Sequence, residues 1–294
     1  MSSPPLASWA PAKVNLFLHV GPVQPNGRHP LDSLVVFAGT EAADRLGVEA
    51  ADGLSLEISG PSAEGLEAGP DNLVLKAAMA LREAADVTAG AAFRLEKSLP
   101  VAAGIGGGSA DAAAALRLLT ELWRTDPAFA RSVAPALGGD VPVALHGGPA
   151  LMQGEGEQVV PVPQLPPVPA LLANPGIACP TGPVFRAYDA AGGGAEFRVL
   201  ASVPEFARTA DLIEWLGHQR NDLERPAVAL VPQIAKVLED LAALPGARLA
   251  RMSGSGATCF ALFDRSDDAE AAAAHLRLTH PDWWIRATQL GAAP

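Results

Sequence analysis

A glycine-rich segment between a predicted strand and a strongly helical stretch constrains this chain more than any other feature. Residues 104–111 read Gly-Ile-Gly-Gly-Gly-Ser-Ala-Asp, and the helix that follows repeats apolar residues at Ala112, Leu116, Leu119 and Trp123. Glycines let a backbone turn its amides towards a ligand, and the start of a helix adds partial positive charge. This pattern predicts a loop that binds a polyphosphate; a flexible connection is the alternative interpretation.

The loop does not match the common phosphate-binding motifs. A dinucleotide fingerprint that starts at Gly104 requires glycine or alanine where Ser109 stands, which disfavours a Rossmann oxidoreductase. A Walker A loop requires Gly-Lys-Ser/Thr, and residues 98–140 contain no lysine. Ser109 is not a nucleophile elbow either, because the second residue after it is Asp111 rather than glycine. The sequence therefore points to a third class of loop.

Composition excludes several classes of partner. The 294 residues carry 21 basic and 32 acidic side chains, a net charge of −11, which disfavours nucleic acid or an anionic membrane as a partner. With 49% hydrophobic and only 18% charged residues, the chain can bury a large core. Cys179 and Cys259 are too few for a disulfide framework and lack metal-type spacing, which favours a cytoplasmic location.

We expect neither a secretory leader nor a membrane span. Residues 1–13 lack a charged start followed by an apolar run. Residues 158–185 carry no charge, but prolines at 161, 163, 166, 167, 169 and 175 interrupt them, and a segment with prolines at that density cannot form a spanning helix.

Hydrophobic periodicity predicts a mixed α+β chain. We expect a hairpin of strands over residues 12–20 and 31–39, and further strands at 54–59, 91–99, 141–152, 257–263 and 282–290. Helices are expected at 73–85, capped by Asp71 or Asn72, and at 112–123, 209–217, 231–244 and, also capped, 267–278. The proline-rich residues 159–173 are the best candidate for a linker. The order of the elements lacks the βαβ rhythm of a parallel sheet.

Three segments, in this order, carry a family resemblance: Pro-Ala-Lys-Val-Asn-Leu at 11–16, the glycine loop at 100–110, and Met-Ser-Gly-Ser-Gly-Ala-Thr at 252–258. With them the chain resembles the GHMP kinases, which include galactokinases, homoserine kinases and mevalonate kinases. Two further segments, Leu-Gly-Gly-Asp-Val-Pro around Asp140 and Asn-Asp-Leu-Glu at 221–224, make it most similar to the branch that acts on 4-diphosphocytidyl-2-C-methyl-D-erythritol. The resemblance covers residues 10–290.

The resemblance implies a fold and a reaction. The fold is two-lobed α+β, with a ribosomal-S5-domain-2-like N-terminal lobe over residues 1–160, which contains the phosphate loop, and a ferredoxin-like C-terminal lobe over 161–294. The reaction is ATP-dependent phosphorylation of the 2-hydroxyl of that cytidine-diphosphate alcohol, in the non-mevalonate pathway to isoprenoid precursors. The implied partners are these two small molecules.

The implied catalytic residues are Asp140 and Lys13. Asp140 takes the position of the general base towards the acceptor hydroxyl, and Lys13 that of an ammonium near both Asp140 and the transferred phosphoryl group. Asn15, two residues along the same strand face, would position the substrate. Without the resemblance, an aspartate after two glycines is typical of a solvated turn, and a strand lysine of an exposed edge.

The implied binding residues form two groups. His29 would contact the cytosine, Thr181 and Phe185 would line the same pocket, and Arg28, which replaces the usual tyrosine, could stack on the base. ATP would bind with its adenine near Asn72, Leu73 and Lys97, and with its phosphates over Pro100, Val101, Ala102, Ala103, Gly104, Ile105, Gly106, Gly107, Gly108, Ser109 and Ala110. Judged alone, His29 is a turn residue and Lys97 a surface lysine.

Mg²⁺ is expected with ATP because it neutralises the phosphates during transfer. No cluster of carboxylates in the sequence identifies its ligands, so we expect phosphate oxygens and water to hold it, with Ser109 as an alternative ligand. The Gly254-Ser255-Gly256 turn would close the loop side of the site, or serve only as a tight turn before a strand. Two alternatives stay open: a GHMP kinase for another alcohol, which residues 221–224 and the segment around Asp140 disfavour, and a non-catalytic nucleotide-binding protein, which the presence of both Lys13 and Asp140 disfavours.

Overall fold

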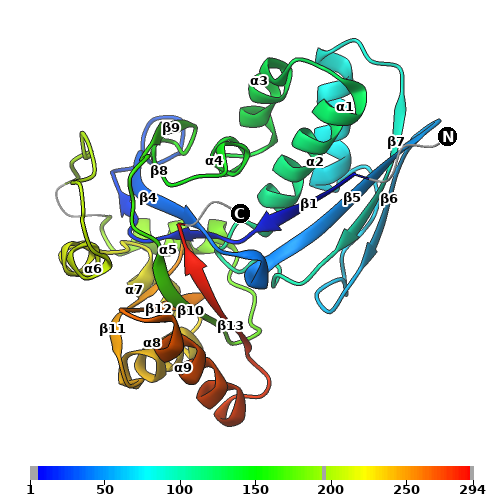
Figure 1. Ribbon diagram of the computed structural model, residues 1–294. Coiled ribbons are helices and arrows are strands. Elements are labelled where there is room, and N and C mark those ends of the chain that lie inside the picture. The colour runs from blue at the N-terminus through cyan, green and yellow to red at the C-terminus, as the bar shows by residue number, and fades with distance from the viewer. Residues whose placement is uncertain (1–5, 194–196, 292–294) are drawn as a thin grey trace. The chain divides into compact units, whose positions relative to one another are not determined.

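The chain crosses several times between two structural units, so neither unit is continuous in sequence (Figure 1). The computed structural model describes residues 6–193 and 197–291. Unit 1 takes the N-terminal segment up to Ala12 with residues 43–101 and 106–147, and unit 2 takes residues 13–42, 102–105 and the chain from Gly148 onward. The domain boundary predicted at residue 160 does not coincide with this division.

Unit 1 is one sheet with helices packed against it. The strand order is β1-β5-β7-β6, antiparallel except for the β6–β7 pair. Helix α2 packs on β1 and β5, and α1 packs on α2 and β6. The elements are β1 (Leu6–Pro11), β5 (Ala43–Ala51), β6 (Leu54–Ser59), α1 (Leu73–Ala84), β7 (Gly90–Glu96), α2 (Gly107–Trp123), α3 (Pro127–Leu137) and α4 (Val141–His146).

Helix α2 starts directly from the glycine loop. Gly106 is its N-cap with a left-handed backbone (φ +62°), a conformation that glycine adopts without strain. The buried alanines at 112–115 allow close packing against neighbouring elements of unit 1. Helix α1 starts as expected at Asn72, whose side-chain oxygen accepts a hydrogen bond from the Val74 amide at 3.0 Å.

Unit 2 contains two sheets. One has the order β2-β4-β8-β9, with β3 also paired to β4, and the other has the order β11-β12-β10-β13. The elements are β2 (Lys13–Asn15), β3 (His19–Val20), β4 (Leu31–Phe37), η1 (Thr40–Ala42), β8 (Ala150–Gly154), β9 (Gln158–Pro161), β10 (Val168–Asn174), α5 (Thr181–Ala190), α6 (Thr209–Gly217), α7 (Glu224–Leu230), α8 (Gln233–Ala243), β11 (Ala247–Met252), β12 (Cys259–Phe263), α9 (Ser266–Thr279) and β13 (Trp284–Leu290).

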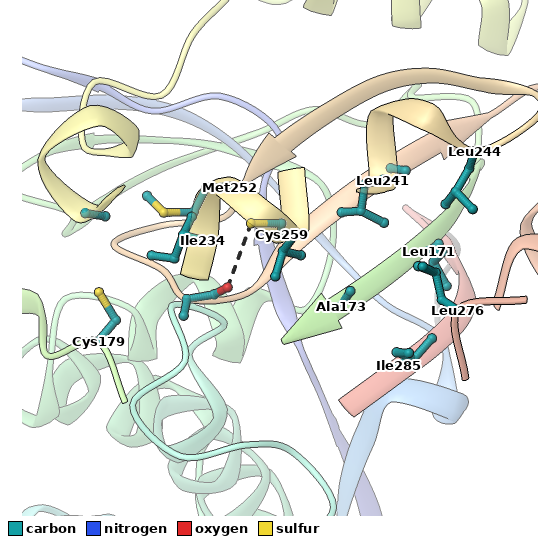
Figure 2. Packing of buried hydrophobic residues seen from close by; sticks show 14 of the residues in the cluster. Leu171, Ala173, Cys179, Ile234, Leu241, Leu244, Met252, Cys259, Leu276 and Ile285 are labelled. Carbon is teal, nitrogen blue, oxygen red and sulfur yellow. Dashed lines mark hydrogen bonds between the residues drawn. The ribbon is translucent and has the colours of Figure 1, made fainter. Parts of the chain in front are cut away.

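The core of unit 2 lies between the second sheet and helices α8 and α9. Figure 2 shows Leu171 and Ala173 on β10 with Ile234 and Leu241 on α8 on the same side of the strand, and all four are buried. Cys179 and Cys259 belong to this core and form no disulfide. The continuous apolar run of β12, which is buried at every position, and the helical spacing of α8 therefore predict their buried positions correctly.

Four sequence predictions differ from the structure. Residues 141–152 form helix α4 and then the start of strand β8. Pro142 favours the helix because amides in the first turn have no partner within the helix, so its missing N–H costs nothing, and its fixed φ suits a helix. Residues 159–173 contribute strands β9 and β10 of unit 2 instead of a linker. The strand expected over 12–20 is interrupted between β2 and β3, although both pair antiparallel with β4 as the hairpin required. Helix α9 starts after Arg265, which makes no side-chain cap.

Within residues 6–193 and 197–291, no helix combines the length and apolar character needed to cross a membrane.

Candidate active site

The first half of the glycine loop is fixed in place by hydrogen bonds that its carbonyl groups accept. Four consecutive carbonyls, those of Ala102, Ala103, Gly104 and Ile105, accept hydrogen bonds within unit 2. The donors are, in the same order, the Cys179 amide (3.1 Å), the Thr258 amide (3.1 Å), the Ser253 hydroxyl (3.2 Å) and the Lys13 amide (2.9 Å). Because a trans peptide places C=O and the next N–H on opposite sides, the amides of residues 103–106 face away from these donors.

Two glycine segments pack backbone against backbone here. A Cβ at Gly104 would lie 2.5 Å from the Ser253 carbonyl oxygen and 2.6 Å from the Gly256 nitrogen, and one at Gly254 would lie 2.6 Å from the Gly104 oxygen. Both glycines have positive φ, +74° and +56°. The loop and the turn at 253–256 are therefore one interlocked structure that only glycine allows.

Asn15 lies next to this interlocked structure. Its backbone amide donates to the Ser253 hydroxyl at 3.1 Å, and its side-chain nitrogen donates to the Ser33 hydroxyl at 2.7 Å. Its side-chain oxygen has no hydrogen-bond partner in the described part of the chain, although it is buried, and a Cβ at Gly254 would be 3.3 Å from it. A buried acceptor without a donor is suited to receive a hydroxyl or amide of a ligand.

The two residues expected to be catalytic lie in different units. Lys13 is buried on β2, paired with Phe37 in register, so it is not the exposed edge lysine that the strand alone would suggest. Asp140 is half-buried at the N-cap of α4, where its carbonyl accepts from the Ala144 amide at 3.0 Å. Each residue is thus fixed by the backbone of its own unit.

Lys97 takes part in a buried charge cluster that the sequence did not predict. Its ammonium donates to Asp44 and, at 2.7 Å, to Asp111, and all three side chains are at most 5% exposed. Asp44 also accepts from the amides of Ser98 (2.6 Å) and Leu99 (2.8 Å). A Cβ at Gly107 would lie 3.3 Å from the Lys97 nitrogen, so the cluster directly underlies the first turn of α2.

The cluster changes the acidity of its members. Burial raises the pKa of Asp111, Lys97 opposes this and Asp44 adds to it, and the resulting pKa is about 7. Burial by itself would lower the pKa of Lys97, but the two neighbouring carboxylates outweigh that effect and raise it. One ammonium cannot neutralise two buried carboxylates, so the pKa of Asp111 stays above its ordinary value despite the contact with Lys97.

The residues expected at the cytidine are held by partners within unit 2. Arg28 is exposed and pairs with Glu155 at 2.9 Å, and Asn26 donates to the same carboxylate at 2.5 Å. His29 is buried, unlike a typical turn histidine, with Nδ1 2.9 Å from the Gly21 carbonyl and Nε2 3.2 Å from Asp189. The centres of the His29 and Phe185 rings are 5.1 Å apart. These two predicted residues are therefore neighbours.

Thr181 connects to the glycine turn. Its hydroxyl lies 2.9 Å from that of Ser255, and the Cys179 thiol donates to the Ser255 carbonyl at 3.2 Å. The segment that enters helix α5 is therefore joined to the turn at 253–256.

The adenine residues predicted at the start of α1 lie near the loop. Leu73 follows the cap Asn72, and a Cβ at Gly108 would lie 3.4 Å from the Leu73 side chain. Leu73 and Lys97 thus contact the two glycines that open α2, within unit 1.

Sequence reasoning missed the cluster that Asp44 and Asp111 form with Lys97. Asp111 stood in the glycine motif, and an acidic residue before a run of buried alanines was the available signal. Asp44 follows two alanines in an ordinary strand and gave none. For a metal ion, the described ranges contain no cluster of three or more His, Cys, Asp or Glu side chains that could hold one.

Family models match both halves of the chain. The model of the GHMP kinases N terminal domain matches residues 72–148, which include the loop, α2 and Asp140. The model of the GHMP kinases C terminal domain matches residues 201–282, which include Asn221 and the glycine turn.

Relatives that match nearly the whole chain have the same family assignment. The chain is 61% identical over 291 residues to a 4-diphosphocytidyl-2-C-methyl-D-erythritol kinase of Hyphomonas neptunium, with 98% of both chains covered. It is 48% identical to a protein of the same name from Dinoroseobacter shibae, covering 98% of this chain and 96% of that one. A crystal structure of 4-(cytidine 5'-diphospho)-2C-methyl-D-erythritol kinase matches with a TM-score of 0.77 and 36% identity, over 98% of this chain and 100% of that chain. The chain therefore belongs to the GHMP kinases, with their two-lobed α+β fold, and within them to the 4-diphosphocytidyl-2-C-methyl-D-erythritol kinase family.

Proposed function

We propose that this kinase transfers the γ-phosphoryl group of ATP to the 2-hydroxyl of 4-diphosphocytidyl-2-C-methyl-D-erythritol, a step towards isoprenoid precursors. The family implies ATP as the phosphoryl donor. The names of the two relatives and of the solved structure support the acceptor. A cytoplasmic location and a family-domain boundary near residue 160 belong to the same proposal.

The observation that carries the proposal is the loop held by its carbonyls. Because the carbonyls of residues 102–105 are bonded within unit 2, the opposite amides are available to phosphate oxygens, as are those of the uncapped first turn of α2. An anion site built from amides needs no basic patch. Such a site would allow a chain with a net charge of −11 to bind the phosphates of ATP.

We assign Asp140 as the general base and Lys13 as the local cation. Asp140 would accept the proton of the 2-hydroxyl as its oxygen attacks phosphorus, and Lys13 would stabilise the charge that develops on the transferred group. Asn15 would accept a hydrogen bond from the substrate through its unpartnered oxygen.

The cytidine would be bound around Arg28, His29, Thr181 and Phe185. The His29 ring is already held by Gly21 and Asp189, which would fix its orientation beside Phe185. Arg28 would replace the tyrosine wall of the family by stacking its guanidinium on the base, oriented by Glu155. The adenine would lie near Asn72, Leu73 and Lys97.

Mg²⁺ would accompany ATP and neutralise phosphate charge when bound. The donor set fits an ion held mainly by phosphate oxygens and water, since no cage of acidic side chains exists within the described ranges and Asp44 and Asp111 are engaged with Lys97. In this proposal Asp140 acts on the substrate hydroxyl and Lys13 on the transferred phosphoryl group.

A coupled assay of ADP release tests the proposal. Diphosphocytidyl methylerythritol, mevalonate and homoserine are offered separately with Mg-ATP, with omission of the metal as a control. We expect turnover with the first substrate only. Turnover with mevalonate or homoserine alone would show a different GHMP kinase, and ATP binding without turnover of any alcohol would favour a non-catalytic nucleotide-binding protein.

A further inference from the structure

The segment Asn221–Glu224 has no part in the mechanism above, yet it forms hydrogen bonds to the backbone of the glycine turn at residues 252–256. Asn221 is buried, and its side-chain nitrogen donates to the Met252 carbonyl and the Gly254 carbonyl, each at 2.8 Å. Its side-chain oxygen accepts from the Leu223 amide at 2.9 Å. One amide group thus holds the backbone on both sides of Ser253.

The same segment also bonds Leu18, which lies between β3 and β2, the strand that carries Asn15. The Leu18 amide donates to the Arg220 carbonyl and the Asp222 amide to the Leu18 carbonyl, both at 2.9 Å. The Glu224 carboxylate accepts from the Met252 amide at 2.9 Å. Residues 220–224 therefore bond to both the segment that follows Asn15 and the segment that contains Ser253. Asn15 and Ser253 are 238 residues apart in sequence and are themselves hydrogen-bonded.

Ser253 passes this constraint to the loop. Its hydroxyl accepts from the Asn15 amide and donates to the Gly104 carbonyl, and Gly254 packs against that same carbonyl. On the other side of the turn, a Cβ at Gly256 would lie 2.7 Å from the Met252 sulfur and 3.2 Å from the Ile234 side chain (Figure 2 shows both side chains). These close contacts, together with the bonds to Asn221, hold the turn in one position.

We propose that Asn221 is a positioning residue: by fixing the carbonyls of Met252 and Gly254 it sets the place of Ser253, and through Ser253 the places of the Gly104 carbonyl and the Asn15 backbone. Its effect on turnover rests on the proposed function. Its effect on the loop does not.

Asn221→Asp is the direct test. Aspartate has the same shape and keeps the acceptor for the Leu223 amide, but its carboxylate cannot donate to two backbone carbonyls and would face their lone pairs. Asn174→Asp is the matched control. Asn174 is also buried, accepts from the Gly176 amide at 2.8 Å and donates to the Thr258 hydroxyl at 2.9 Å. That hydroxyl can rotate and donate to the new carboxylate, so this bond can survive.

Two measurements give independent readouts. Amide hydrogen exchange should be about tenfold or more faster at Lys13, Asn15 and residues 252–258 of Asn221→Asp, because the amides of Lys13 and Thr258 bond the loop carbonyls and that of Asn15 bonds Ser253. It should be unchanged there in Asn174→Asp. The kcat should fall about 10²-fold in Asn221→Asp with the KM for ATP within about threefold, because small displacements of a positioned group affect the reacting geometry most. In Asn174→Asp the kcat should stay within about threefold of the wild type.

A folded Asn221→Asp variant with wild-type exchange at the Lys13 and Thr258 amides, which bond the loop carbonyls, would overturn the proposal. A kcat lowered only in proportion to the folded fraction would overturn it as well. If Asn221→Asp does not fold, Glu224→Ala removes the acceptor for Met252 alone, and Glu224→Gln restores an acceptor. We then expect faster exchange in 252–258 for the first and rescue by the second, and no difference between them would contradict the proposal. If the wild type transfers no phosphoryl group, the proposed function fails, and the exchange experiment still decides the role of Asn221.

Discussion

Lys97 donates a hydrogen bond to Asp111 over 2.7 Å in the interior of unit 1, and the same ammonium contacts Asp44. A lysine between two buried carboxylates leaves one negative charge uncompensated unless a proton is shared. The cluster lies under Gly107, so its charge is set close to the first turn of α2.

Stability should therefore depend on the protonation of Asp111. Its pKa is about 7 in the folded chain, against an ordinary value of 3.8. Between these values the native state holds a proton that the unfolded chain has released, so stability falls as the pH rises through this window. The slope is at most about 1.4 kcal/mol per pH unit. Urea unfolding from pH 4.5 to 8 measures it.

Asp111→Asn provides the comparison for this slope. The variant keeps an acceptor for Lys97 and removes the titrating group, so its unfolding free energy should fall less with pH over the same range. The raised pKa of Lys97 affects stability only above its ordinary value of 10.5, outside this window. Equal slopes in both proteins would show that Asp111 does not hold the proton.

Gly104→Ala should abolish the interlocked structure of the loop and the turn. The new methyl group would lie 2.5 Å from the Ser253 carbonyl oxygen at a φ of +74°, so we expect more than about 2 kcal/mol of destabilisation. Gly53→Ala is the control, because a Cβ there meets nothing within 4 Å. Thermal unfolding of both variants checks this, and similar midpoints would contradict the close approach at Gly104.

Asp140→Ala should leave the fold intact and lower turnover about 10²-fold or more, as the loss of a positioned base requires. The residue is half-buried and its cap position uses the backbone, so the side chain is not needed for α4. Circular dichroism establishes folding, and the ADP-release assay gives kcat. Unchanged turnover would remove Asp140 from the mechanism.

Arg28→Ala should raise the KM for the cytidine substrate and leave the KM for ATP unchanged. Arg94→Ala serves as the control, since Arg94 also forms an exposed pair, with Glu49 at 2.9 Å, and has no assigned role. Both should change stability by less than about 1 kcal/mol. Equal effects of Arg28→Ala on the two KM values would mean that the cytidine pocket is elsewhere.

Much of the local structure could be predicted from the sequence, because its causes are local. The cap at Asn72, the helical spacing of α8 and the continuous apolar run of β12 each depend on residues within a few turns or one strand. Residues 141–152 were misassigned because a short apolar run with an early proline fits a strand or the first turn of a helix equally well.

The sequence by itself determined the family, the α+β class and the glycine loop, since backbone freedom and hydrophobic periodicity are properties of the chain. Only the tertiary structure decided what surrounds the loop. The bonds from Lys13, Ser253 and Thr258 to its carbonyls, the buried Asp44 beside Lys97, and the hold of Asn221 on the glycine turn all join residues far apart in sequence. Such contacts depend on packing, which no local pattern encodes.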